Sequence, residues 1–203
     1  MFTWWIDADR TAKKSLVAAS LGWMLDSFDV MLYALVLLAV RNDLGIDNST
    51  AGALASYTLV ASAAGGLMFG VLADKWGRTR ALMLSVLIYS VFTAACGFAQ
   101  TVGQLAVFRI CLGIGMGGEW ASGAALVSET WSERDRGKAL GFMQSSWAIG
   151  YALAAIVSWL VQDVMGLSWR AVFFVGILPA LYALWVRRNV EEPAMWKAEK
   201  AKP

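Results

Sequence analysis

Four ionisable side chains stand inside long apolar runs of the sequence: Asp26, Asp29, Arg109 and Glu119. A charged group in the middle of a bilayer is costly, so each of the four marks a candidate functional site. Asp26, Asp29 and Tyr33 recur at i, i+3 and i+7 and therefore share one face of a helix. Because burial and a like-charged neighbour both disfavour an ionised carboxylate, one of these acids could take up and release a proton.

The apolar runs themselves predict a membrane protein. The chain has 203 residues, of which 59% are hydrophobic and 16% charged, and its mean hydropathy is +0.57. Soluble domains carry about 25% charged residues. About 20 apolar residues cross the hydrocarbon core as a helix, and the alternating pattern of barrel strands is not seen. We expect one all-α membrane domain over residues 1–203, with six transmembrane helices at about 15–40, 50–73, 80–99, 104–128, 138–161 and 169–186.

The basic residues are distributed unevenly between the two sides of this predicted bundle. Of the 17 Lys and Arg residues, all but Arg41, Arg109 and Arg170 lie in the termini or in the loops after the second and fourth spans. The positive-inside rule then places both termini in the cytoplasm, here of a bacterial-type inner membrane. Tryptophans near the span ends are expected to act as interfacial anchors: Trp76, Trp131 and Trp185 inside, Trp159 and Trp169 outside.

The first and fourth spans run in opposite directions, which allows a rough estimate of depth. With 1.5 Å of rise per residue, the two aspartates lie near the midplane, Arg109 about 9 Å to the outer side and Glu119 about 6 Å to the inner side. We therefore expect Asp29 near Arg109 and Asp26 near Glu119. The alternative is a buried ion pair that only holds helices together.

Glycine spacing gives a second signal. Gly66 with Gly70, and Gly113 with Gly117, form GxxxG pairs that allow close helix packing in lipid. The glycines of the fourth span also fit the dinucleotide-binding pattern G-x-G-x-x-G. We reject this interpretation, because that motif needs a preceding strand in a soluble unit. The chain has no histidine, and nothing in the sequence predicts an enzyme, a cofactor, a metal site or a nucleic-acid partner.

The loop after the second span combines glycines, one carboxylate and several cations. A short turn of this kind can form a charge-assisted latch to a neighbouring helix end. An ordinary positive-inside loop would explain the cations but not the spacing of the glycines and the acid. The gating loop is predicted at Gly70, Asp74, Lys75, Gly77, Arg78 and Arg80.

This loop resembles the signature G-x-x-x-D-[RK]-x-G-R-[RK] of the major facilitator superfamily. The run from Arg109 to Trp120 is similar to a second signature of that family, and the resemblance covers essentially the whole chain. Further matching elements follow the fourth and sixth spans: Glu129, Arg134, Arg136 and Gly137, then Glu192, Pro193 and Trp196. The segments 25–29 and 169–179 look most like metabolite:proton symporters of the sialate and lactate carboxylate type.

The resemblance implies two inverted three-helix repeats, with the first helix of each repeat lining a central cavity. It implies proton-coupled uptake of a small organic anion, a carboxylate, by alternating access. Asp26 or Asp29 would carry the proton, and Arg109 and Glu119 would tune it or form a salt bridge. Asp74 with Arg78 would act in gating. Drug:proton antiport is disfavoured, because no proline occurs between residues 138 and 161.

Members of this superfamily normally have about twelve helices, whereas six are expected here. The first expectation is an N-terminal half whose second six-helix half is missing. The alternatives are a homo-oligomeric six-helix channel or helper subunit, or an inactive truncated fragment; within transporters, sugar uptake is the alternative to carboxylate uptake. The expected partners are the lipid bilayer, protons, a small-molecule substrate and either a second half or further copies of the chain.

Overall fold

The computed structural model describes residues 3–200, and within this range the chain is helical, without strands. Five helices are long and apolar enough to cross a membrane: α2, α3, α4, α5, and α6 with its π-helical extension η1. The elements in chain order are α1 (Thr3–Ile6), α2 (Arg10–Leu44), α3 (Asn48–Trp76), α4 (Arg78–Cys96), α5 (Val102–Thr130), α6 (Arg136–Trp159), η1 (Leu160–Val164), α7 (Trp169–Val175), α8 (Pro179–Asn189) and α9 (Ala194–Lys200).

Side chains at three helix starts satisfy backbone N–H groups that have no partner within the helix. Asp9, Asp47 and Thr101 precede α2, α3 and α5, and each accepts a hydrogen bond from the N–H three residues later, at 2.6, 2.8 and 3.2 Å. Such caps favour a start at that residue. At the end of α2, Gly45 adopts a left-handed conformation with φ 64°, which closes the helix.

The predicted span 169–186 is divided between α7 and α8. Between them the backbone forms a tighter turn, in which the N–H groups of Gly176 and Leu178 donate to Phe173 and Val175 at 3.0 Å. Pro179, the first residue of α8, has no N–H to continue the helical ladder. Neither piece alone has the length of a membrane span.

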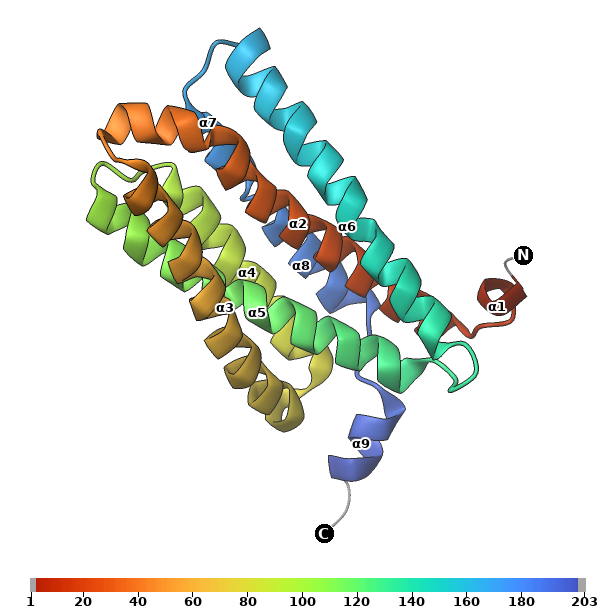
Figure 1. Ribbon diagram of the computed structural model, residues 1–203. Helices are drawn as coiled ribbons and strands as arrows, with labels where there is room; N and C mark the ends of the chain where they lie inside the picture. The colour runs from red at the N-terminus through yellow and green to blue at the C-terminus, as the bar shows by residue number, and fades with distance from the viewer. Residues whose placement is uncertain (1–2, 201–203) are drawn as a thin grey trace.

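The long helices form a bundle in which α5 packs against α3, α4 and α2, and α6 runs along α2 (Figure 1). The chain ends, α1 and α9, lie at the same end of the bundle as the α3–α4 and α5–α6 loops, which we call the terminal end. If α2–α4 form one repeat and α5–α8 the other, then α2 corresponds to α5 and α3 corresponds to α6. In each repeat the second helix packs against the first helix of the other repeat: α3 against α5, and α6 against α2. This correspondence is the arrangement expected of two three-helix repeats.

Glycines make the two corresponding contacts possible. A methyl group at Gly117 of α5 would overlap the carbonyl oxygen of Ser62 on α3, and one at Gly113 would overlap that of Thr58. In the corresponding contact, a methyl group at Gly150 of α6 would overlap a carbonyl oxygen of α2. In lipid, where apolar burial does not drive association, such close backbone approach stabilises helix pairs.

On α3 the position with no room for a side chain is Gly65 rather than the predicted Gly66. A methyl group at Gly65 would overlap the backbone of Ile114, whereas at Gly66 it would lie 3.6 Å from the nearest atom of α5. A methyl group at Gly70 would have no neighbour within 4 Å. The predicted Gly66 still takes part in the close contact, because a methyl group at Gly117 would overlap its backbone nitrogen. The GxxxG spacing therefore identified this contact and missed only Gly65, because the tightest positions depend on how α3 is rotated about its axis.

Two of the tryptophans expected as interfacial anchors are instead buried. Trp131 donates a hydrogen bond from its indole to the carbonyl of Ala12 at 2.9 Å. Trp169 donates to Asp43 at 3.3 Å. Both indoles therefore join helix ends within the protein.

Candidate functional site

The five residues predicted for the substrate and proton pathway are all buried in the bundle. Their exposed fractions are 0% for Glu119, 2% for Asp29, 3% for Asp26 and Tyr33, and 4% for Arg109. All five come from α2 and α5, but their side chains reach different surroundings. The structure therefore distinguishes the surroundings of these five residues, which the sequence could only assign together to one pathway.

Asp29 points toward α4. Its Oδ2 accepts a hydrogen bond from the Thr93 hydroxyl at 2.9 Å, while its Oδ1 has no hydrogen-bond partner. Thr93 was not among the predicted residues. The sequence did contain a hint of its role: Thr93 places a hydroxyl inside the apolar third span, and a buried hydroxyl usually has a hydrogen-bond partner.

Arg109 does not form a salt bridge, which was one of the two roles expected for it. Within residues 3–200, no carboxylate oxygen lies within 4.0 Å of its guanidinium nitrogens. Its guanidinium carbon instead lies 3.6 Å from the centre of the Tyr33 ring, and the Tyr33 hydroxyl donates to the Ala51 carbonyl at 3.0 Å. The side chain meets α2 one turn beyond Asp29, so a cation–π contact takes the place of the ion pair.

Glu119 projects from α5 to a notch in α2. A methyl group at Gly22 would overlap its Oε1, so glycine is required for the carboxylate to fit there. Tyr182 of α8 closes the same space and donates its hydroxyl to the carbonyl of Ala18. Neither carboxylate oxygen of Glu119 has a hydrogen-bond partner. Burial without partners is less costly for a neutral acid than for a carboxylate.

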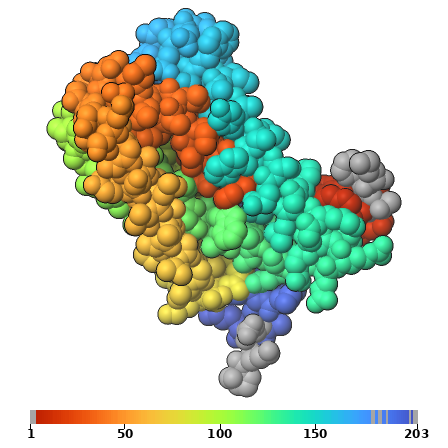
Figure 2. Space-filling model, in the orientation of Figure 1, coloured from red at the N-terminus to blue at the C-terminus, as the bar shows by residue number. Residues whose placement is uncertain are grey.

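Asp26 is the member of the set that reaches an open cavity. It is close enough to Glu119 and Asp29 to interact with both electrostatically, as expected for the Asp26–Glu119 pair. Its Oδ1 has no hydrogen-bond partner. Asp26 lines a cavity of about 450 Å³ on the face where α2, α3, α5 and α6 meet, which is turned toward the viewer in Figure 2.

Three tryptophans from three helices surround this cavity: Trp23 of α2, Trp120 of α5 and Trp147 of α6. Trp23 lies 4.8 Å from Trp147 and 6.4 Å from Trp120 between ring centres. Sequence reasoning did not assign these residues a role in binding. The available signal was that Trp23 and Asp26 are three residues apart, on one face of a helix.

The predicted gating loop forms a network of charges at the terminal end. Arg78 contacts Asp74 at 2.5 Å and Glu129 at 2.8 Å, and thus joins the end of α3 to the end of α5. The side chains of Lys75 and Arg80 are exposed. The structure therefore brings Asp74 and Arg78 together, as predicted, and adds Glu129 as the second acid.

The segment after α8 completes this network. The carboxylate of Glu192 accepts hydrogen bonds from the backbone N–H groups of Thr79 and Arg80, at 3.1 and 3.2 Å. It thereby caps α4, whose preceding residue, Gly77, has no side chain to do so and has φ 112°. A methyl group at Gly77 would overlap this carboxylate. Trp196 donates its indole N–H to the carbonyl of Asp74 at 2.9 Å.

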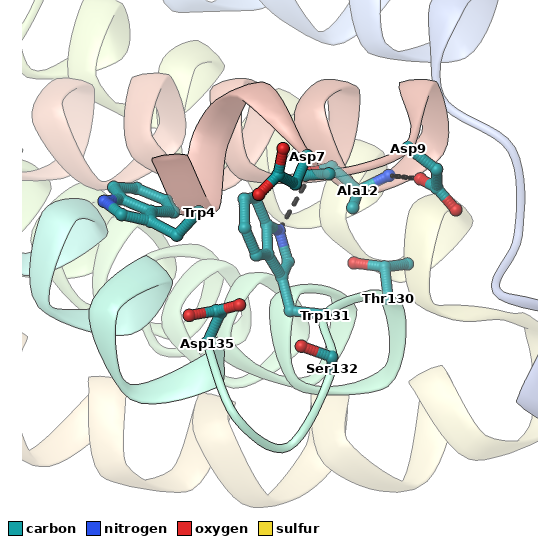
Figure 3. Close-up of a pocket in the computed structure, with 9 residues that line it drawn as sticks. Trp4, Asp7, Asp9, Ala12, Thr130, Trp131, Ser132 and Asp135 are labelled. Atoms are coloured by element: carbon teal, nitrogen blue, oxygen red, sulfur yellow. Dashed lines mark hydrogen bonds between the residues drawn. The ribbon is translucent and has the colours of Figure 1, made fainter. Parts of the chain in front are cut away.

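A second hollow, of about 320 Å³, lies at the terminal end beside Trp131 and is shown in Figure 3. Trp4 of α1 lies 5.2 Å from Trp131 between ring centres. Two of the three acids that line this hollow have partners: Asp9 caps α2, and Asp135 pairs with Lys138 at 2.6 Å. The third, Asp7, is exposed. We interpret this region as a joint between α1, α2 and the α5–α6 loop.

Comparison with known proteins gives a consistent picture. The family model described as Major Facilitator Superfamily matches residues 19–203. The probable 4-methylmuconolactone transporter of Cupriavidus pinatubonensis is 40% identical over 202 residues, which are 97% of this chain and 46% of that protein. The sialic acid transporter NanX of Escherichia coli is 35% identical, over 98% of this chain and 49% of that protein. The chain therefore spans about half the length of these curated relatives.

A solved structure shows the same fold. The xylose transporter XylE from E. coli, in a partially occluded inward-open conformation, matches 96% of this chain and 52% of its own with a TM-score of 0.79. At 20% sequence identity, this similarity concerns the fold alone. The predicted all-α architecture, half of a two-part bundle, is thereby confirmed.

Proposed function

Because the chain belongs to the Major Facilitator Superfamily, we propose that it forms the N-terminal half of a secondary transporter that couples proton entry to uptake of a small organic carboxylate. It would work by alternating access in a bacterial cytoplasmic membrane, with both termini in the cytoplasm, and not as an enzyme. The names of the sialic acid and 4-methylmuconolactone transporters support an organic acid as substrate. The cavity face would be covered by a second six-helix half.

One observation carries the proposal: Asp26 is buried, lacks a partner at Oδ1 and lines the cavity. An ionised Asp26 would repel an anionic substrate, whereas a protonated Asp26 would not. Loading of the anion is therefore favoured when the proton is present, which is the thermodynamic requirement of symport. We assign the coupling proton to Asp26, with Asp29 as the second candidate from the sequence.

Arg109 and Glu119 have supporting roles in this proposal. Arg109 is held on Tyr33 behind the cavity, where its positive charge acts on Asp29 from a distance rather than through an ion pair. Glu119 would set the charge around Asp26. Both would tune the site without touching the substrate.

The network of Asp74, Arg78 and Glu129 would act as the latch. It joins helices α3, α4 and α5 at the terminal end, where the two halves of a transporter would close against each other. A contact made in one conformation and not in the other shifts the population toward the state that contains it. We therefore expect the latch to set the balance between states rather than the chemistry of binding.

The test is uptake into proteoliposomes carrying the chain together with its second six-helix half, with an imposed pH gradient that is alkaline inside. Labelled N-acetylneuraminate and cis,cis-muconate serve as probes, and protein-free liposomes give the background. We expect uptake that collapses with an uncoupler, and an Asp26→Asn variant whose remaining uptake no longer responds to the gradient. Downhill flux that is independent of the gradient in both proteins would instead favour the six-helix channel.

Asp29→Asn is the matched variant for this test. It changes a neighbouring acid on the same helix that binds Thr93 instead of lining the cavity. If Asp26 carries the coupling proton, Asp29→Asn keeps gradient-driven uptake at a reduced rate. Gradient dependence lost in Asp29→Asn but kept in Asp26→Asn would transfer the proton to Asp29.

A further inference from the structure

We propose that Trp23, Trp120 and Trp147 make the cavity selective for flat, unsaturated carboxylic acids over saturated or polyhydroxylated ones. The indoles would stack on the carbon skeleton, while protonated Asp26 donates a hydrogen bond to the carboxylate of the substrate. This inference rests on the proposed function and specifies its substrate class.

The first support is the geometry of the aromatic wall. The ring planes of Trp23 and Trp147 are inclined by 47°, and those of Trp23 and Trp120 by 50°. The rings do not stack closely on one another, and all three contribute to the lining of the cavity. Trp120 is 49% exposed, which leaves much of its indole available to a ligand. Aromatic faces attract other π-systems in offset or edge arrangements, beyond the contribution of buried area.

The second support is the small number of hydrogen-bonding groups in the lining. Besides the indoles, the polar side chains are those of Asp26 and Ser62, and the Ser62 hydroxyl already donates to the carbonyl of Leu59 at 2.8 Å. A sugar would bring several hydroxyl groups into this cavity and lose their bonds to water without replacement. The part of the wall described here therefore discriminates against polyhydroxylated substrates.

The third support is the position of Asp26 relative to the aromatic wall. Asp26 lies three residues after Trp23 and is only 3% exposed, yet it forms part of the cavity wall. A carboxylic acid that donates to a carboxylate forms a short, charge-assisted O–H···O⁻ bond. One end of the ligand would thus meet the acid while its carbon skeleton meets the indoles.

Isothermal titration of the purified full chain in detergent micelles tests this inference with three probes. Benzoate and cyclohexanecarboxylate have the same charge and ring size but differ in planarity, and D-xylose represents the sugars. We expect benzoate to bind about five-fold more tightly than cyclohexanecarboxylate, and D-xylose to give no binding heat.

Substitutions of the indoles provide the second arm of the experiment. Trp120→Leu and Trp147→Leu keep apolar surface but remove the π-system, so the preference for benzoate is expected to disappear. Trp120→Phe should retain most of it. Trp159→Leu is the matched control, because Trp159 is a half-exposed indole of α6 that does not line this cavity. Circular dichroism verifies that each variant is folded.

Three results would overturn the inference: equal affinity for the two ring carboxylates, a preference unchanged by both leucine variants, or binding of D-xylose in place of the acids. An absence of binding by all three probes would also overturn it and would leave the indoles as a surface for another helix. The proposed function is decided separately, by gradient-driven uptake of either N-acetylneuraminate or cis,cis-muconate and its dependence on Asp26. Uptake of the polyhydroxylated N-acetylneuraminate in preference to cis,cis-muconate would keep the proposed function and overturn this inference.

Discussion

The charged residues of the membrane-embedded site and those of the terminal end differ in how well they are paired. At the terminal end, Arg78 has two carboxylate partners and Glu192 receives two backbone N–H groups. In the embedded site, Glu119 has no partner on either oxygen, and Asp26 and Asp29 each have an unpaired Oδ1. The first arrangement stabilises the fold, whereas in the second a change of protonation would break no hydrogen bond at the unpaired oxygens, as the proposed function requires.

This difference predicts opposite responses to loss of charge. Removing one member of a paired network leaves the other members desolvated without a partner, which is costly. Removing the charge of an acid that has no partner removes a cost instead. Thermodynamic stability in mixed micelles, measured by titration with a denaturing detergent, can therefore separate the two regions.

The largest effect is expected for Arg78→Gln. The side chains of Arg78 and Glu129 are only 15% and 17% exposed, so the substitution leaves Glu129 poorly solvated and unpaired. We expect the free energy of unfolding to fall by about 2 kcal/mol. Lys138→Gln, in an ion pair whose lysine is 55% exposed, is the control and should cost less than about 0.5 kcal/mol. Equal effects of the two substitutions would contradict the role of Arg78 as the centre of the network.

Glu192→Ala should have the next largest effect. It removes the cap of α4 and leaves the N–H groups of Thr79 and Arg80 without their acceptor. Loss of a helix cap costs about 1 kcal/mol, and loss of a negative charge at a helix N-terminus adds to this. Glu191→Ala is the matched control, because the Glu191 side chain is exposed and makes only an exposed ion pair with Lys197, while its backbone carbonyl, which accepts from the Thr79 hydroxyl, is kept. Hydrogen exchange at the start of α4 should increase in Glu192→Ala alone.

Thr93→Val tests the one paired contact of the embedded acids. Valine has nearly the same shape as threonine but cannot donate to Asp29, so we expect a loss of about 1 kcal/mol in the free energy of unfolding. In the double variant with Asp29→Asn, most of this loss should disappear, because the two residues act through one hydrogen bond. Fully additive losses would show that Thr93 contributes through packing instead.

The smallest effect is expected for Glu119→Gln, although Glu119 is the most deeply buried of the acids. Because neither of its oxygens has a partner, the substitution removes a potential charge and breaks no hydrogen bond. Stability should stay within about 1 kcal/mol of the parent protein or increase. A loss as large as that of Arg78→Gln would end the distinction between the two regions.

Much of the fold and part of the site could be predicted from the sequence. The all-α fold follows from the length of the apolar runs, and the family from the loop around Asp74 and Arg78, as the match over residues 19–203 confirms. Asp26 and Glu119 were recognisable because a charge inside a span is costly wherever the side chain points. Their assignment to proton coupling and tuning stays a prediction.

The remaining features depend on how the helices are rotated and packed. Counting residues along α2 and α5 estimates depth but not azimuth. Arg109 and Asp29 are near enough to interact electrostatically, as expected, but the direct contact of the guanidinium is with Tyr33. Thr93 is 64 positions from Asp29, and no local pattern joins them. The division of the sixth span at Pro179 was readable in principle, since proline interrupts the helical hydrogen-bond ladder.

The cap that Glu192 provides for α4 also bears on how the protein is made. Its carboxylate comes from a residue 113 positions after Thr79, so the start of α4 leaves the ribosome well before its cap has been synthesised. At about 5–20 residues per second, this interval is roughly 6–23 s. During this time α4 would have to reside in the membrane or the insertion machinery with its first N–H groups unpaired by Glu192. The end of the six-helix unit thus completes a helix that was inserted near its beginning, which makes assembly dependent on the order of synthesis.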